Sequence, residues 1–138
     1  SIDLASEAKS LNAAELEHMY RLKTGRLLWV SVMSAAYCDP TMTAAGLHSL
    51  ERFIDALGLA FQIRDDILDI EGCSDVIGKP QGSDLELDKA TYPALFGMQA
   101  AKDRTQELLE IALASIEHLG EPADILRWIG NYIVQRES

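Results

Sequence analysis

Cysteine, positive charge and long apolar runs are all scarce in this 138-residue sequence. The two cysteines, Cys38 and Cys73, stand too far apart for a CxxC motif, so we expect small packed side chains in a reducing compartment such as the cytoplasm. The formal net charge of −10 argues against nucleic acid or an anionic membrane as the main partner. No apolar run is long enough to span a membrane, which argues against stable membrane insertion.

Strand-like alternation is also missing, and apolar residues recur with helical spacing almost throughout the sequence. Asn12 followed by Glu15 resembles a capping box and predicts a helix that continues to the Asp39-Pro40 pair. The first ten residues have the pattern of a helix end. We therefore expect these 138 residues to belong to a longer chain.

The second half of the sequence has the same helical character. A long helix is expected from residue 41 or 43 to about Gly72, followed by a loop from about Cys73 to Asp88. Pro93 suits the first turn of the next helix, and the later helical stretches divide around residues 120–122. The predicted fold class is all-α, with the helices packed as a bundle.

The stretch FQIRDDILDIEG places three acidic residues in a segment that otherwise has the pattern of a buried helix. At about 100° per residue, Gln62, Asp65, Asp66 and Asp69 fall on one side of that helix, and residues 51 and 55 extend the same side backwards. Arg64 points elsewhere. We call this side the acidic stripe; it carries carboxylates at i and i+4 without a basic residue among them.

Solvation on a surface helix is the usual explanation for such a stripe, but three features disfavour it here. Solvated faces normally mix both signs of charge, like charges at i and i+4 destabilise a helix, and the C-terminal end of a helix disfavours anions. Hard oxygen ligands at this spacing suit Mg²⁺, which often bridges carboxylates and phosphate oxygens. We therefore favour a metal site over a solvated face.

Four motifs make the sequence similar to the trans-isoprenyl diphosphate synthases, and most similar to their bacterial farnesyl diphosphate synthase (geranyltranstransferase) branch. That family carries a KT pair, an FQ-x-x-DD-x-x-D segment, a GK pair and a K-x-T-x-P segment. Here these are Lys23-Thr24, Gln62 with Asp65, Asp66 and Asp69, Gly78-Lys79, and Lys89 with Thr91 and Pro93. A DDxxD segment alone is a weak signal, whereas four motifs in the family's order are a strong one.

The resemblance implies a head-to-tail prenyl transfer. An allylic diphosphate ionises, isopentenyl diphosphate attacks the cation, and loss of a proton gives a longer allylic diphosphate such as farnesyl diphosphate. The family uses about three Mg²⁺ ions, held between two aspartate-rich motifs on facing helices, and one ion is expected on the second motif. Such a reaction needs positive charge fixed around the departing diphosphate.

The resemblance also assigns roles to single residues. Asp65 is expected to be the principal Mg²⁺ ligand, with Asp66 and Asp69 acting directly or through metal-bound water. The substrate-binding residues are expected to be Lys23, Thr24, Gln62, Lys79 and Lys89, and the first four of these are also the expected catalytic residues. Taken alone, the lysines would be ordinary surface residues and Gln62 a satisfied core amide. Arg136 is expected to be an exposed terminal side chain.

Part of the family pattern has no counterpart in this sequence, namely the first aspartate-rich motif and the basic residues that bind isopentenyl diphosphate. By resemblance, residues 1–138 are the C-terminal part of a single all-helical synthase domain. We expect this chain alone to be catalytically inactive and to expose an apolar face that other helices would cover. The full-length protein is expected to be a homodimer.

Three other functions stay open. The first is a non-catalytic partner subunit of a heteromeric prenyl synthase, but such subunits often lose aspartates of the second motif, and this sequence keeps all three. A helical interaction module could instead present the acidic stripe to a basic partner. A terpene cyclase would have a similar fold, yet the lysine motifs fit chain elongation better.

Overall fold

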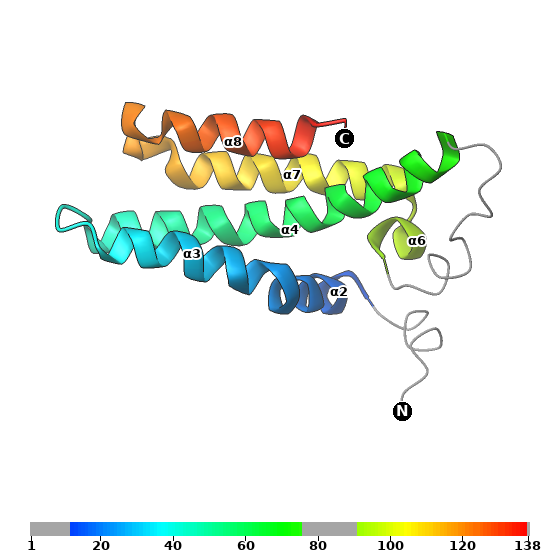
Figure 1. Ribbon diagram of the computed structural model, residues 1–138, viewed down its shortest axis with the longest axis horizontal. Coiled ribbons are helices and arrows are strands. Elements are labelled where there is room, and N and C mark those ends of the chain that lie inside the picture. Colours follow the sequence, from blue (N-terminus) through cyan, green and yellow to red (C-terminus); the bar gives the residue numbers. More distant parts are fainter. Residues whose placement is uncertain (1–11, 76–90, 138) are drawn as a thin grey trace.

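A computed structural model of the protein describes residues 12–75 and 91–137, and within these two ranges it contains no β-strand. The long helix α4 (Ala44–Asp75) runs through the middle of the bundle (Figure 1). Helix α7 (Met98–Ile116) packs along one side of α4, and α2 (Ala13–Tyr20) and α3 (Arg26–Tyr37) pack along the other. The described residues confirm the all-α prediction.

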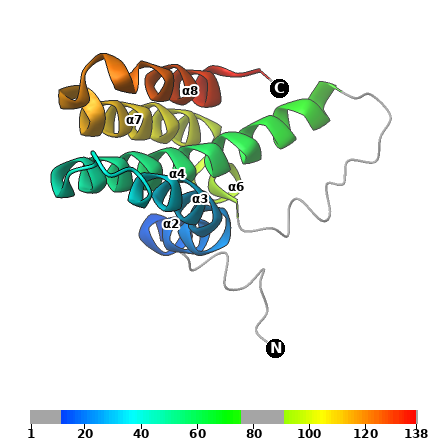
Figure 2. The same cartoon turned by 60° about the vertical axis from the view of Figure 1, so that its left-hand side comes forward.

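Two shorter segments complete the arrangement. Helix α6 (Tyr92–Phe96) packs against α7 and α4, and α8 (Asp124–Gln135) covers α7 and also contacts α4 (Figure 2). The turns η2 (Glu117–Leu119) and η3 (Glu121–Ala123) reverse the chain between α7 and α8. Gly120 lies between them with a positive φ of 69°, a conformation that favours glycine. The predicted break around residues 120–122 is confirmed.

Side-chain caps explain where several helices begin. The Asn12 side chain accepts a hydrogen bond from the Glu15 N–H at 2.8 Å, as the predicted cap requires. The Thr43 hydroxyl accepts one from the Gly46 N–H at 3.0 Å, so α4 begins directly after Thr43. Helix α6 has its own threonine cap at residue 91 and a proline in its first turn, as predicted.

The first predicted helix is not continuous. Between α2 and α3 lies η1 (Arg21–Gly25), a π-helical turn in which the backbone is more loosely wound. The flanking residues Tyr20 and Arg26 keep ordinary α-helical torsion angles, so the change is confined to this one turn. The apolar residues on either side keep their helical spacing, and the sequence pattern therefore predicted an unbroken helix.

Helix α4 extends to Asp75 and does not end near Gly72 as predicted. One glycine inside a helix costs only about 1 kcal/mol relative to alanine, which is too little to end a helix of 32 residues. The start of the expected loop, from Cys73 to Asp75, is therefore helical. The remainder of that loop lies outside the described residues.

The core forms where α4 meets its neighbours. The largest fully buried side chains of this core are Leu16, Met33, Leu59, Ile63, Ile67, Leu109 and Ile116. A charged pair crosses the same interior, because the Arg104 guanidinium on α7 donates to both Glu17 carboxylate oxygens on α2, at 2.7 and 2.8 Å. Cys38 is exposed, which corrects the packed position expected for it; the fold leaves it just beyond the last turn of α3.

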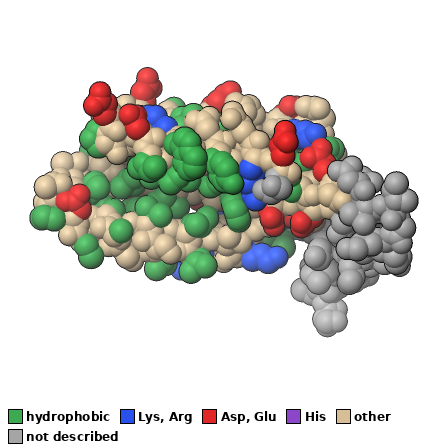
Figure 3. Space-filling view, turned by 45° about the horizontal axis from the view of Figure 1, so that its top comes forward, with side chains coloured by type: hydrophobic (Ala, Val, Ile, Leu, Met, Phe, Trp, Pro, Cys, Tyr) green, Lys and Arg blue, Asp and Glu red, His purple; other side chains and the backbone are tan. Residues whose placement is uncertain are grey.

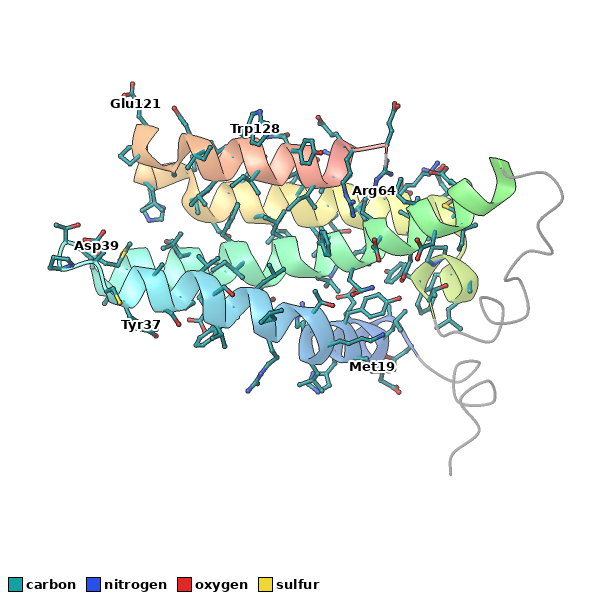
Figure 4. The ribbon with its side chains drawn as sticks, viewed as in Figure 1. Met19, Tyr37, Asp39, Arg64, Glu121 and Trp128 are labelled. Atoms are coloured by element: carbon teal, nitrogen blue, oxygen red, sulfur yellow. The ribbon has the colours of Figure 1, made fainter. Side chains whose placement is uncertain are left out.

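Large apolar side chains lie on the outside of two parts of the bundle. In the stretch from α2 through η1 to α3, they are Met19, Leu22, Leu27, Val30 and Tyr37. On α8 they are Ile125, Trp128 and Tyr132, and Figure 3 shows hydrophobic side chains gathered on the face that carries this helix. Figure 4 shows Met19 and Tyr37 on the outer side of the bundle, and Trp128 on the outer side of α8. Among the described helices, none is both long enough and apolar enough to cross a membrane.

Candidate functional site

Helix α4 carries the whole acidic stripe, but its members differ in burial. Asp65 keeps 48 % of its side-chain surface exposed and Asp69 is exposed, whereas Asp66 is buried. Gln62, one turn earlier, is half-buried. The stripe therefore has an open edge at Asp65 and Asp69 and an inner edge at Asp66, which faces α2.

Asp66 is held inside by Tyr20, whose hydroxyl is in turn bonded to the Tyr92 backbone. The Tyr20 hydroxyl on α2 donates a hydrogen bond to the Asp66 carboxylate, and the same hydroxyl oxygen accepts a hydrogen bond from the Tyr92 N–H at 3.1 Å. Burial raises the pKa of the Asp66 carboxyl; the nearby charges of Asp65 and Asp69 act in the same direction, and the Tyr20 bond opposes them. Burial and the Asp66 carboxylate together raise the pKa of the Tyr20 hydroxyl far above its usual range.

The KT pair lies in the π-helical turn η1, directly opposite the stripe. The Thr24 hydroxyl donates to the Gln62 side-chain oxygen at 2.8 Å, and both residues are half-buried. Lys23 is exposed on the same turn. Two motifs separated by 38 residues thus meet between η1 and α4.

Two arginines from other elements approach the stripe. Arg21 donates from its Nε to both Asp55 oxygens, at 3.0 and 3.1 Å. Arg136, just past the end of α8, places its Nη2 3.8 Å from an Asp65 oxygen and its guanidinium 5.1 Å from the centre of the Phe61 ring. The sequence pattern showed the stripe without basic residues because these partners come from distant parts of the chain.

Arg136 also corrects the expectation of an exposed terminal side chain. Its side chain is 17 % exposed, and its Nε and Nη2 are buried without a hydrogen-bond acceptor in the described part of the chain. Arg64 fixes the local backbone by donating from Nε and Nη2 to the Arg136 carbonyl oxygen, at 3.1 and 2.6 Å. Figure 4 shows Arg64 between α4 and the end of α8.

Two expected diphosphate-binding residues, Lys79 and Lys89, lie outside the described residues. Of the K-x-T-x-P motif, Thr91, Tyr92 and Pro93 are described, and they form the cap and first turn of α6. The Tyr92 N–H bond to Tyr20 therefore anchors the end of this motif beside Asp66.

The donor set on the open edge fits a hard cation. Within the described ranges, no three His, Cys, Asp or Glu side chains converge on a common metal position. Asp65 and Asp69 lie one turn apart on the open edge of the stripe, which suits a Mg²⁺ ion that keeps several waters and is shared with a phosphate group. Asp65 and Asp69 are therefore the residues that would hold Mg²⁺, and Asp66 stands behind them.

Comparison with known proteins decides the family. A sequence model described as "Polyprenyl synthetase" matches residues 1–127. The chain belongs to the polyprenyl synthetase family. This membership confirms the resemblance that the KT, FQ-x-x-DD-x-x-D, GK and K-x-T-x-P motifs indicated.

Curated relatives of this polyprenyl synthetase chain include farnesyl diphosphate synthases. The chain is 45% identical over 140 residues to that of Haemophilus influenzae and 36% identical over 141 residues to that of Escherichia coli. In both comparisons it is covered completely and spans 47% of the relative. The chain thus spans about half the length of the curated relatives it matches.

A solved structure gives the same result for the fold. A crystal structure from Marinomonas sp. MED121, described as that of a candidate farnesyl-diphosphate synthase, matches with a TM-score of 0.74 and 36% sequence identity. The match covers 96% of this polyprenyl synthetase chain and 44% of that chain. The all-helical bundle is therefore part of the fold found in that structure.

Two residues of the site were missed from sequence. Tyr20 stands four residues before Thr24, so a helical projection of residues 13–25 would have placed it on the same side as the KT threonine. Nothing in the sequence pairs Arg136 with Asp65, because 71 positions separate them. The roles assigned to the six described site residues stay predictions.

Proposed function

We propose that this chain supplies one half of the Mg²⁺–diphosphate site of a prenyltransferase that condenses isopentenyl diphosphate with an allylic diphosphate. The first aspartate-rich motif and the isopentenyl diphosphate site would lie in another part of a longer, homodimeric, cytoplasmic protein. A short-chain product such as farnesyl diphosphate is the choice that the farnesyl diphosphate synthase relatives favour.

The hydrogen bond between Thr24 and Gln62 carries this proposal. It brings the KT pair against the helix of the second aspartate-rich motif, so η1 and α4 are in contact at these two motifs. A lysine, two polar oxygens and two outward carboxylates then lie on neighbouring turns. An acidic surface module would not require a threonine to be fixed against Gln62 in this way.

Each residue has a distinct task in the proposed reaction. Mg²⁺ held by Asp65 and Asp69 would supply the positive charge that draws the diphosphate away. The Lys23 ammonium would bind the same diphosphate directly, as a cation on a flexible stem. The Thr24 hydroxyl and the Gln62 amide, held together at 2.8 Å, would direct oxygen dipoles at the allylic carbon as positive charge develops there.

Binding of Mg²⁺ and inorganic pyrophosphate to the full-length protein tests this function. Calorimetry should detect pyrophosphate binding that requires Mg²⁺, and Asp65→Ala should weaken it at least about tenfold, because the principal carboxylate is lost. The matched control is Asp124→Ala, which removes an exposed aspartate on α8 and should leave binding unchanged. Metal-independent binding, or equal effects of the two variants, would favour a plain helical interaction module.

A prenyl transfer assay separates the enzyme from its alternatives. The full-length protein should convert isopentenyl diphosphate and an allylic diphosphate to a longer product in the presence of Mg²⁺. The 138-residue chain alone should show no turnover, since it lacks the first aspartate-rich motif. Turnover by the full-length protein only after another subunit is added would instead support the partner-subunit hypothesis.

A further inference from the structure

The Tyr20 hydroxyl is bonded on both sides within the interior. It donates to the Asp66 carboxylate on α4, and it accepts the Tyr92 N–H at the start of α6. Tyr20 is 6 % exposed, Tyr92 is 7 % exposed and Asp66 is 9 % exposed. One phenol group therefore ties together three elements of the bundle, and each of these elements carries or adjoins a motif of the proposed site.

The spacing of the cross-links fixes the register of the two main elements. Tyr20 lies one turn before Thr24 on the α2–η1 segment, and Asp66 lies one turn after Gln62 on α4. The pairs Tyr20–Asp66 and Thr24–Gln62 thus form two successive rungs between these antiparallel segments. Sliding one segment along the other would break both bonds and would leave buried polar groups unsatisfied.

We propose that Tyr20 is a positioning residue of the metal and diphosphate site. It draws the Asp66 carboxylate to the inner edge of the stripe, which leaves Asp65 and Asp69 to face the cation. Through the Tyr92 N–H it also fixes the end of the K-x-T-x-P motif at a constant place relative to those carboxylates. This inference rests on the proposed function, because it assigns the Tyr20 hydroxyl a task toward the Mg²⁺ that Asp65 and Asp69 would hold.

A purely structural role is the alternative for Tyr20, since a buried tyrosine usually finds a hydrogen-bond partner. The two roles differ in what the hydroxyl affects. A structural hydroxyl contributes to the stability of the metal-free fold alone. A positioning hydroxyl also sets how well the acidic stripe binds Mg²⁺, and outer-shell groups of this kind typically change metal affinity about 10–100-fold when they are removed.

Tyr20→Phe in the full-length protein tests the inference, because it removes only the hydroxyl. Calorimetric titration with Mg²⁺ in the presence of inorganic pyrophosphate should give a Mg²⁺ Kd at least about tenfold higher than that of wild type. The Tyr92 amide should exchange its hydrogen faster with solvent, since it loses its acceptor. Tyr132→Phe is the matched control, because Tyr132 is 56 % exposed on α8; it should leave both measurements unchanged.

A double-mutant cycle keeps the test decisive if Tyr20→Phe is also less stable. Asp66→Ala, which removes the acceptor of the Tyr20 hydroxyl, and the double variant are titrated in the same way, after circular dichroism has shown that each variant is folded without metal. If Tyr20 acts through Asp66, its loss should have little further effect on Mg²⁺ affinity once Asp66→Ala is present. Fully additive effects, or an unchanged Kd in a folded Tyr20→Phe protein, overturn the positioning role and leave the proposed function standing. Absence of Mg²⁺-dependent pyrophosphate binding in wild type overturns both.

Discussion

Adjacent aspartates have different surroundings in this site. Asp65 and Asp66 are neighbours in sequence, yet the 100° step of the helix directs the first toward solvent and the second toward α2. An Asp65 oxygen lies 3.8 Å from the Arg136 Nη2, while Asp66 accepts a hydrogen bond from Tyr20. The DD pair is therefore one outward-facing carboxylate and one inward-facing carboxylate, and the two should respond differently to substitution.

Asp66→Asn should stabilise the protein at neutral pH. Because the folded-state pKa of Asp66 is raised above its ordinary value of 3.8, the ionised carboxylate costs stability at pH 7. Asparagine keeps the size of the side chain and an oxygen acceptor for the Tyr20 hydroxyl but carries no charge. The melting temperature of the variant should exceed that of wild type at pH 7, as measured by circular dichroism.

The pH dependence of this difference provides the check. The gain should shrink as the pH falls through the raised pKa, since wild-type Asp66 is then protonated. Asp39→Asn is the control of opposite sign: hydrogen bonds from Thr41 lower the pKa of Asp39, so its charge is favourable near neutral pH and its loss should not stabilise. A gain for Asp66→Asn that does not change with pH would exclude the ionised carboxylate as its cause.

At the scale of elements, helix pairing decides where the motifs meet. The π-helical turn η1 carries the KT pair, and its neighbour α4 carries the aspartates. At this crossing an added Cβ on Gly58 would lie 3.6 Å from the Gly25 Cα, so the two segments approach closely. Because the two backbones approach closely here, the side chains of Thr24 and Gln62, and those of Tyr20 and Asp66, can reach each other and form hydrogen bonds.

The buried ion pair between Arg104 on α7 and Glu17 on α2 should contribute strongly to the unfolding free energy of the bundle. Arg104→Ala leaves the Glu17 carboxylate, 9 % exposed, without its bidentate partner, and should cost roughly 3 kcal/mol of unfolding free energy, as for other buried pairs. The Glu17 bond raises the pKa of Arg104, which agrees with a favourable pair in the folded state. Urea unfolding followed by circular dichroism measures the loss.

Arg21→Ala is the matched control for this measurement. It also breaks an arginine–carboxylate pair, with Asp55, but these side chains are 38% and 50% exposed. An exposed pair should contribute under about 1 kcal/mol. Equal losses for Arg104→Ala and Arg21→Ala would show that burial does not set the strength of the α2–α7 pair.

At the scale of the whole molecule, two outer surfaces are too apolar for a free helical bundle. Leu27 is 70 % exposed on α3, while on α8 Trp128 is 63 % exposed and stacks on Tyr132 with ring centres 5.5 Å apart. The groove beside these rings has a volume of about 410 Å³. Surfaces of this kind normally bind another protein segment.

The 138-residue chain should therefore associate with itself at high concentration in spite of its charge of −10. Trp128→Lys should shift it toward the monomer, because a charged side chain would replace the ring that is most exposed on α8. Gln106→Lys adds the same charge at an exposed position of α7 and should leave association unchanged. Light scattering coupled to size-exclusion chromatography measures both, and a Trp128→Lys chain that associates like wild type would remove α8 from the contact.

Local pattern was sufficient for several features. Asn12 begins its helix as predicted, the chain breaks around residues 120–122, and the aspartates share one face of α4, because caps, turns and helical periodicity depend on residues within a few positions of one another. The motifs around Lys23 and Gln62 also carried the family, since their order along the chain is itself sequence information.

What the sequence by itself determined is therefore the helical class, most helix starts, the acidic stripe and the family. Only the tertiary structure decided that Asp66 turns inward to Tyr20, that the KT pair lies in a π-helical turn, and that Arg136 folds back over Phe61 toward Asp65. These features depend on packing between residues 46 to 75 positions apart, and on a change of helix winding within a single turn. The helical period determines which side of a helix a residue occupies. The elements packed against that side determine how buried the residue is, which partners it bonds and how its pKa is shifted.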